Sequence, residues 1–326
     1  MELLKKLCSI YSPSGNEENI CEFLADELKG CGDEIYKDVL GNLIVHKKGN
    51  GKKLMLAAHF DEIGVAVTYI DDNGFLRFGA VGGVDPIYSL YQRVEFKNGT
   101  KGVVSYEESI DSVKNIKLNK MFIDIGAKNK ADAEKKVSIG DFACFTGEFT
   151  DMGERVSSKA LDNRAGVYVL AETLKNIKNS NYDLYFVFTS QEEVGLRGAR
   201  VSAFGIEPDI AIAVDVTDTG DTPNCKSMAV KLGDGPAIKV KDSSVICDKD
   251  IREALEKCAK DNDIPYQREI MEYGGTDAGV IHTTKYGVKT GAVSIPVRYI
   301  HSTSETADKN DIENAVKLLT LFCEEN

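Results

Sequence analysis

A change in the residue pattern along the chain limits its possible folds more than any other feature. Up to about residue 65, and again after Val156, helical patterns alternate with short apolar runs such as residues 54–58, LMLAA. Runs of this kind are typical of strands buried on both faces. Between these stretches, short β-rich segments are separated by turns such as DNG at residues 72–74. This order predicts an α/β domain that carries an inserted β domain.

Apolar periodicity places the elements of the predicted α/β domain. Helices are expected in the N-terminal segment and at residues 20–28, 162–173, 250–262 and 311–322, and strands at residues 41–46, 54–58, 184–189, 210–214 and 290–295. The β-rich block indicates a small barrel with one helical stretch, at residues 131–137. We therefore assign residues 1–65 and 157–326 to the α/β domain and residues 66–156 to the inserted domain.

Charge and composition argue against several classes of partner. With 52 acidic and 40 basic residues, the net charge is −12, whereas nucleic acids and anionic membranes attract basic surfaces. No apolar run approaches the ~20 residues of a membrane span. The N-terminal MELLKKLCSIYSPSG is expected to be a helix and not a signal peptide. The eight cysteines form no C-x-x-C motif and are too sparse for a disulfide framework. We expect a cytoplasmic protein that binds neither nucleic acid nor membrane.

Side chains that can bind metals follow four of the predicted strands. Each lies at, or a few residues beyond, the carboxyl end of its strand, which is where open α/β sheets bind ligands. These residues are His59, Glu192, Glu193, Asp215 and His301. Acidic residues are common in this chain, so the positions alone indicate no more than that a metal site is plausible.

The residue types narrow the chemistry. The spacing of His59 and Asp61 allows the carboxylate to accept the free ring N–H and select the tautomer that a metal-bound histidine needs. Of the adjacent Glu192 and Glu193, one carboxylate can bind a metal while the other stays free as a base. Asp162 opens a predicted helix and is equally explained as a helix cap. Two imidazoles with several carboxylates suit zinc, cobalt or manganese. This ligand set is neither a thiolate site nor an all-oxygen magnesium site.

Six motifs, in this order, resemble those of the tetrahedral (TET) aminopeptidases, metallopeptidase family 42, within the dinuclear-zinc exopeptidase clan. They are HFDEIG, KALDNRAG, TSQEEVGLRGA, AVDVT, YGGTDA and VRYIHSTSE, and they span residues 59–305. The resemblance implies a zinc-exopeptidase-like α/β fold, with a mixed, mostly parallel sheet flanked by helices, and a PDZ-like inserted domain. It also implies a metal-dependent aminopeptidase that releases N-terminal residues from short peptides through a metal-bridging water.

The resemblance further implies two divalent metal ions per subunit, zinc or cobalt or manganese. Asp162 would bridge the two ions instead of capping a helix. His59 and Asp215 would complete the ligands of one ion, and Glu193 and His301 those of the other. The implied assembly is a homo-oligomer, a dodecamer built from dimers.

Three more residues receive roles from the resemblance. Glu192 would be the general base, and Asp61, grouped with it as catalytic, would be the partner of His59. Asp277, in YGGTDA, is a candidate for the substrate pocket, although the same segment could be a turn and helix cap.

Other functions stay open at this point. The nearest alternative is another exopeptidase, or an N-deacylase, of the same clan with the same dimetal site. A glucanase would use two carboxylic acids without a metal bridge and would leave His59, Asp162, Asp215 and His301 unexplained. A non-catalytic binding protein predicts a missing ligand or base, and none is missing. Of the other histidines, His46 is expected to be exposed on an edge strand and His282 to be structural, and Arg164 receives no catalytic role.

Overall fold

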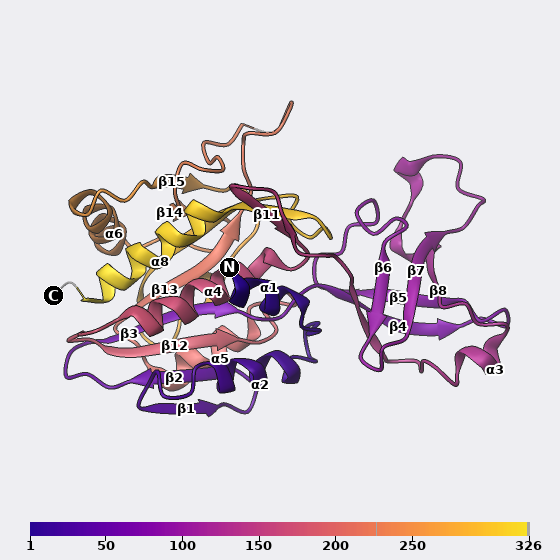
Figure 1. Ribbon diagram of the computed structural model, residues 1–326, viewed down its shortest axis with the longest axis horizontal. Helices are drawn as coiled ribbons and strands as arrows, with labels where there is room; N and C mark the ends of the chain where they lie inside the picture. The colour runs from indigo at the N-terminus through magenta and orange to yellow at the C-terminus, as the bar shows by residue number, and fades with distance from the viewer. Residues whose placement is uncertain (226, 325–326) are drawn as a thin grey trace.

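The structure, a computed structural model, describes residues 1–225 and 227–324 and places a large helix-flanked sheet beside a smaller closed barrel (Figure 1). The helices of the large part are α1 (Glu2–Ser9), α2 (Glu18–Glu27), α4 (Leu161–Asn176), α5 (Arg197–Ile206), α6 (Lys249–Asp261), α7 (Ala278–Ile281) and α8 (Lys309–Glu324). Its strands are β1 (Glu34–Lys37), β2 (Leu43–Lys47), β3 (Lys53–His59), β10 (Thr150–Asp151), β11 (Arg155–Ser158), β12 (Asp183–Thr189), β13 (Ile210–Thr217), β14 (Ala237–Lys241), β15 (Gln267–Ile270), β16 (Lys289–Arg298) and β17 (Glu305–Asp308).

The 11-stranded sheet is mixed, as predicted, and its centre is parallel. The order is β1-β2-β12-β3-β13-β16-β17-β11-β10, and β14 and β15 join beside β16. Strands β12, β3, β13 and β16 run parallel, whereas the outer pairs along this path are antiparallel. Every residue of β13 is buried. Strands covered on both faces need continuous apolar runs, and such runs predicted all four central strands.

The two faces of the sheet pack against different helices. On β3, Leu54 and Leu56 belong to the larger core, whereas Met55 and Ala57 belong to a second one. This division follows from the geometry of a strand, in which neighbouring side chains point to opposite faces. The larger core includes side chains from α1, α2, α4, α6 and α8, and the second includes side chains from α5 and α7.

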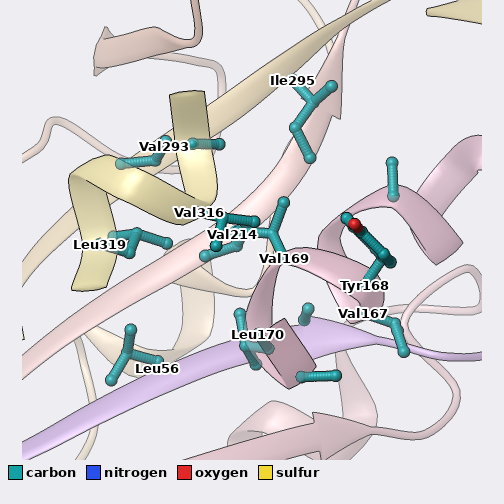
Figure 2. Close-up of a cluster of buried hydrophobic side chains, with 14 of the residues drawn as sticks. Leu56, Val167, Tyr168, Val169, Leu170, Val214, Val293, Ile295, Val316 and Leu319 are labelled. Carbon is teal, nitrogen blue, oxygen red and sulfur yellow. The ribbon is translucent and has the colours of Figure 1, made fainter. Parts of the chain in front are cut away.

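Figure 2 shows the centre of the larger core, where α4 packs on the sheet. Val169 and Leu170 of α4 share this cluster with Leu56 of β3, Val214 of β13 and Leu319 of α8. All five side chains belong to residues that are at most 1% exposed. Because α4 contacts β3, β13 and α8, its first residues are held in a fixed position relative to the ends of these strands.

The β-rich block forms a closed barrel in the order β4-β5-β8-β7-β6-β9. Its strands are β4 (Gly64–Ile70), β5 (Leu76–Val81), β6 (Arg93–Phe96), β7 (Lys101–Tyr106), β8 (Met121–Asp124) and β9 (Phe142–Phe145), with helices η1 (Val113–Asn115), η2 (Leu118–Lys120) and α3 (Lys130–Ala133) between them. The first and last strands pair, with Gly64 opposite Cys144, so the chain enters and leaves the barrel at one place. Strand β11 then rejoins the large sheet beside β17. The division into domains at residues 65/66 and 156/157 stays a prediction.

His46 is not exposed on an edge strand, and that expectation was wrong. Strand β1 covers β2, so β2 lies between β1 and β12. The Nε2 atom of His46 lies 2.6 Å from Asp183 Oδ1, and its ring stacks on Tyr185 with centroids 4.2 Å apart. Strand β1 escaped prediction because its sequence, EIYK, is short and carries charges at both ends.

Strands β14 and β15 also escaped prediction, because each carries a charged residue in a buried position. Lys239 of β14 is 1% exposed and pairs in register with Glu269 of β15, which is 0% exposed. Their side chains form an ion pair. A buried charge is tolerated when its partner is buried with it, and that partner comes from a separate segment.

Two further observations concern membrane spans and cysteines. No helix within residues 1–225 and 227–324 is both long and apolar enough to cross a bilayer. All eight cysteines are free thiols.

Candidate active site

Parallel strands bring the predicted site residues to one edge of the sheet. His59, at the end of β3, lies opposite Thr189 at the end of β12, so the loops that follow these strands begin side by side. The side chains that meet here are His59 from β3, Asp215 from β13, Glu192 and Glu193 from the loop after β12, Asp162 from the start of α4 and His301 from the turn after β16.

Two groups of possible metal ligands share one carboxylate. His59, Asp162 and Asp215 form the first group, and Asp162, Glu193 and His301 form the second, with the ligand atoms of each group within 4.8 Å of one another. His59 Nε2 lies 3.1 Å from Asp162 Oδ1 and 3.6 Å from Asp215 Oδ1. His301 Nε2 lies 3.4 Å from both Asp162 Oδ2 and Glu193 Oε2. These are the five residues that the family resemblance implied as ligands, and their ligand roles stay predictions.

At the start of α4, one residue caps the helix and its neighbour faces the site. Asp162 has non-helical backbone angles, and the N-cap position is occupied by Ala160, which makes no side-chain capping bond. Asn163 caps instead, because its Oδ1 accepts from Gly166 N at 3.0 Å, while its Nδ2 donates to Val214 O at 2.8 Å. The carboxylate of Asp162 is therefore free to face the two histidines.

Asp61 anchors the loop that carries the two glutamates. Its carboxylate accepts hydrogen bonds from Glu192 N at 3.0 Å, Glu193 N at 3.2 Å and Ser14 Oγ at 2.6 Å. His59 Nδ1 lies 3.3 Å from the backbone carbonyl of Asp61 and 3.5 Å from its Oδ1. Asp61 is thus next to the ring, and its role as the partner of His59 stays a prediction; its carboxylate also holds the glutamate loop, which sequence reasoning missed.

Glu305 anchors two of the other site residues and was also missed. It is 2% exposed, and its two carboxylate oxygens accept from the backbone N–H of His301 at 2.8 Å and of Asp162 at 2.9 Å. The available signal was its position as the last residue of the motif VRYIHSTSE.

Asn42 joins the two ends of the loop that carries Glu192 and Glu193, and no sequence signal indicated this role. Its Oδ1 accepts from Ser190 N at 2.9 Å, and its Nδ2 donates to Gly198 O, also at 2.9 Å. Because Asn42 is fully buried and bonds to both ends of residues 190–198, it fixes the shape of this loop.

The site holds more negative charge than its histidines balance. Burial raises the pKa of Glu192 well above its usual value, and nearby carboxylates add to this effect against the opposing charge of His59. Burial would lower the pKa of His301, but Asp162 and Glu193 outweigh it and raise this pKa to about 12. Among the described residues, the ion-pair partners of Asp162, Glu193 and Asp215 are His59 and His301.

This donor set fits divalent cations. Buried carboxylates without cationic partners are costly, and a bound cation removes that cost. Imidazole nitrogen with carboxylate oxygen is the ligand mixture that zinc and similar ions take. Both histidines direct Nε2 at the carboxylates while Nδ1 faces a backbone carbonyl, which is the usual arrangement of metal-bound histidines.

A cavity of about 870 Å³ is lined by the residues of both ligand groups and is large enough for a short peptide end. His59, Glu192 and Asp215 lie in its wall, together with Tyr88 from the barrel. Asp277 is buried and is not among the described residues that line this cavity; it accepts from Thr189 Oγ1 at 2.6 Å. Burial raises the pKa of Asp277 to about 7. Its proposed contact with substrate stays a prediction.

Comparison with known proteins assigns the family. The model of the M42 glutamyl aminopeptidases matches residues 41–318. The chain belongs to the M42 family. A putative aminopeptidase of Acetivibrio thermocellus is 60% identical over 98% of this chain and 96% of its own length. Aminopeptidase APDkam598 of Desulfurococcus kamchatkensis superposes with a TM-score of 0.96 at 41% identity, over 100% of this chain and 94% of its own. The TET1 peptidase of Pyrococcus horikoshii, described as assembling into a tetrahedron or a large octahedral shell, has a TM-score of 0.90 at 36% identity, over 100% and 99%.

Membership in the M42 family accounts for the architecture as a whole. The matched residues include the barrel and both groups of possible ligands. Both structural neighbours cover the full chain, so the sheet with its inserted barrel is shared with them. The resemblance that the six motifs indicated is confirmed.

Proposed function

We propose that this protein is a metal-dependent aminopeptidase that removes N-terminal residues from short peptides. The observation that carries the proposal is the pair of three-residue ligand groups that share Asp162, with Glu192 beside them at the cavity wall. Membership in the M42 family and an aminopeptidase relative at 60% identity support it.

Two divalent ions are the proposed cofactors. His59, Asp162 and Asp215 would hold one, and Asp162, Glu193 and His301 the other. When bound, such ions would polarise the scissile carbonyl and lower the pKa of the attacking water. The mixed nitrogen and oxygen donors suit zinc, cobalt or manganese.

Glu192 is proposed as the general base. Glu192 belongs to neither of the two ligand groups found among the described residues. Its Oε2 nevertheless lies 3.8 Å from His59 Nε2. A carboxylate at this position can take a proton from the attacking water and pass it to the leaving amine. Asp61 supports this role by holding the backbone N–H groups of Glu192 and Glu193.

The proposed activity is tested with amino-acid p-nitroanilides in the presence of zinc, cobalt or manganese. We expect hydrolysis of substrates with a free α-amino group and none of the same substrates after N-acetylation. Cleavage of N-acetylated amino acids instead would favour an N-deacylase. Release of reducing sugar from a β-glucan, without peptide hydrolysis, would favour a glucanase. Inactivity on all three classes with metal bound would contradict an enzymatic function.

We also propose a homo-oligomer, a dodecamer built from dimers; a structure of PhTET1-12s, 36% identical to this chain, is described as a dodecamer. Analytical ultracentrifugation of the metal-loaded protein should give a large discrete species and little monomer. A single monomer peak at working concentration, with metal present, would contradict the proposal.

The eight free thiols support a reducing compartment, and we propose the cytoplasm.

A further inference from the structure

The barrel reaches into the second ligand group through the two glycines that follow β5. His301 Nδ1 lies 2.9 Å from the backbone oxygen of Gly83. A carbonyl oxygen can only accept, so Nδ1 carries the proton of this bond. With a divalent ion in place of the Nε2 proton, the other nitrogen, Nε2, would direct its lone pair to the side where Asp162 and Glu193 lie.

A Cβ atom at either glycine would force neighbouring side chains to move. A Cβ atom on Gly83 would lie 2.6 Å from both Nδ1 and Cε1 of His301. A Cβ atom on Gly82 would lie 3.1 Å from Glu193 Cβ and 2.9 Å from Ile63 Cγ2. Gly82 has a φ of +80°, but Gly83 lies outside the left-handed region. At Gly83 the close approach of the histidine ring is therefore the reason that glycine is needed.

His301 depends on this contact more than His59 depends on its own. The side chain of His301 is 30% exposed, whereas that of His59 is 2% exposed. His59 Nδ1 faces the carbonyl of Asp61, two residues along the chain, but His301 takes its carbonyl from a residue 218 positions away. Packing around a partly exposed ring restricts it less, so the hydrogen bond contributes more to its orientation.

We propose that the backbone carbonyl of Gly83 is a positioning group for His301, through which the barrel controls ion binding at Asp162, Glu193 and His301. This inference rests on the proposed function, because it assumes that these residues bind a divalent ion. Partners of the second ring nitrogen fix the tautomer and direction of a metal-bound histidine, and their loss typically lowers metal affinity about 10- to 100-fold. A shift of the barrel against the sheet would move Gly83 and so change one ion site more than the other.

The test compares Gly83→Ala with Gly79→Ala, a matched change in β5 whose Cβ would meet only Thr68 Cγ2, at 3.6 Å. Zinc is titrated into metal-free protein by calorimetry, and bound zinc is counted by elemental analysis after dialysis. We expect Gly83→Ala to bind one ion with wild-type affinity and the other about 10- to 100-fold more weakly. Gly79→Ala should bind both as the wild type does. Circular dichroism of the metal-free variants checks that they fold as the wild type does.

A second variant acts on the hydrogen bond without touching the barrel. His301 is replaced by Nδ1-methylhistidine, which keeps Nε2 but cannot donate to Gly83. The same replacement at His282, whose Nδ1 lies 2.9 Å from Ala278 O on α7, is the control. We expect the protein methylated at His301 to bind one ion more weakly. The protein methylated at His282 should bind both ions as the wild type does. Wild-type affinity for both ions in Gly83→Ala and in the methylated His301 protein would overturn the inference. If instead the wild-type protein binds no zinc, the proposed function itself fails.

Discussion

Exhaustive chelation is expected to abolish peptide hydrolysis, and added zinc, cobalt or manganese to restore it. The nearby cations Lys159 and Arg298 are paired with Glu62 and Asp221, so we expect the polarisation of the scissile carbonyl to depend on the ions. The measurement is p-nitroanilide hydrolysis against bound metal, counted by elemental analysis. Full activity in protein shown to be free of divalent ions would contradict the metallopeptidase proposal.

Single substitutions of the proposed ligands test the same dependence of activity on bound ions. His59→Ala, Asp215→Asn and His301→Ala should each lower bound metal together with activity, because each would remove a direct bond to an ion. Metal-free and loaded wild-type protein should also differ in thermal unfolding, since a ligand that binds the folded state stabilises it by mass action. A ligand variant that loses activity while keeping both ions tightly bound would show that its residue has another role.

Glu192→Gln is expected to lower kcat by roughly 10²–10⁴ while both ions stay bound. Glutamine keeps the size and much of the hydrogen bonding of glutamate, but it cannot accept the proton from the attacking water. Its backbone N–H can still donate to Asp61, so the loop should keep its shape. Glu22→Gln, a change of the same kind at an exposed residue of α2, is the control and should leave kcat and metal content unchanged.

Glu193→Gln should behave differently, although it lies one residue further along. Glu193 Oε2 faces His301 Nε2 at 3.4 Å and belongs to the second ligand group, so this variant should weaken one ion selectively. Elemental analysis and zinc titration of the two purified variants separate the roles. If Glu192→Gln lost an ion while Glu193→Gln kept both, the two assignments would be reversed.

The central sheet and the edge that carries the site were predictable because their signals are local. A strand buried on both faces needs a run of apolar residues, and β3, β12, β13 and β16 carry such runs. Parallel strands end at the same edge, so polar residues that follow different strands must meet there. The motifs around His59, Asp162 and His301 then indicated the family, and the M42 match confirmed it.

The sequence by itself therefore determined the fold class, the edge of the sheet where chemistry is possible and the side chains able to bind metal. Only the tertiary structure decided how those side chains are held. Glu305 binds the N–H of Asp162 across 143 positions, Asn42 that of Ser190 across 148, and Gly83 offers its carbonyl to His301 across 218. Each contact uses a backbone group, and backbone carbonyls and N–H groups occur in nearly every residue. Nearly any residue could supply the backbone partner of such a contact, so folding decides which of them support the site.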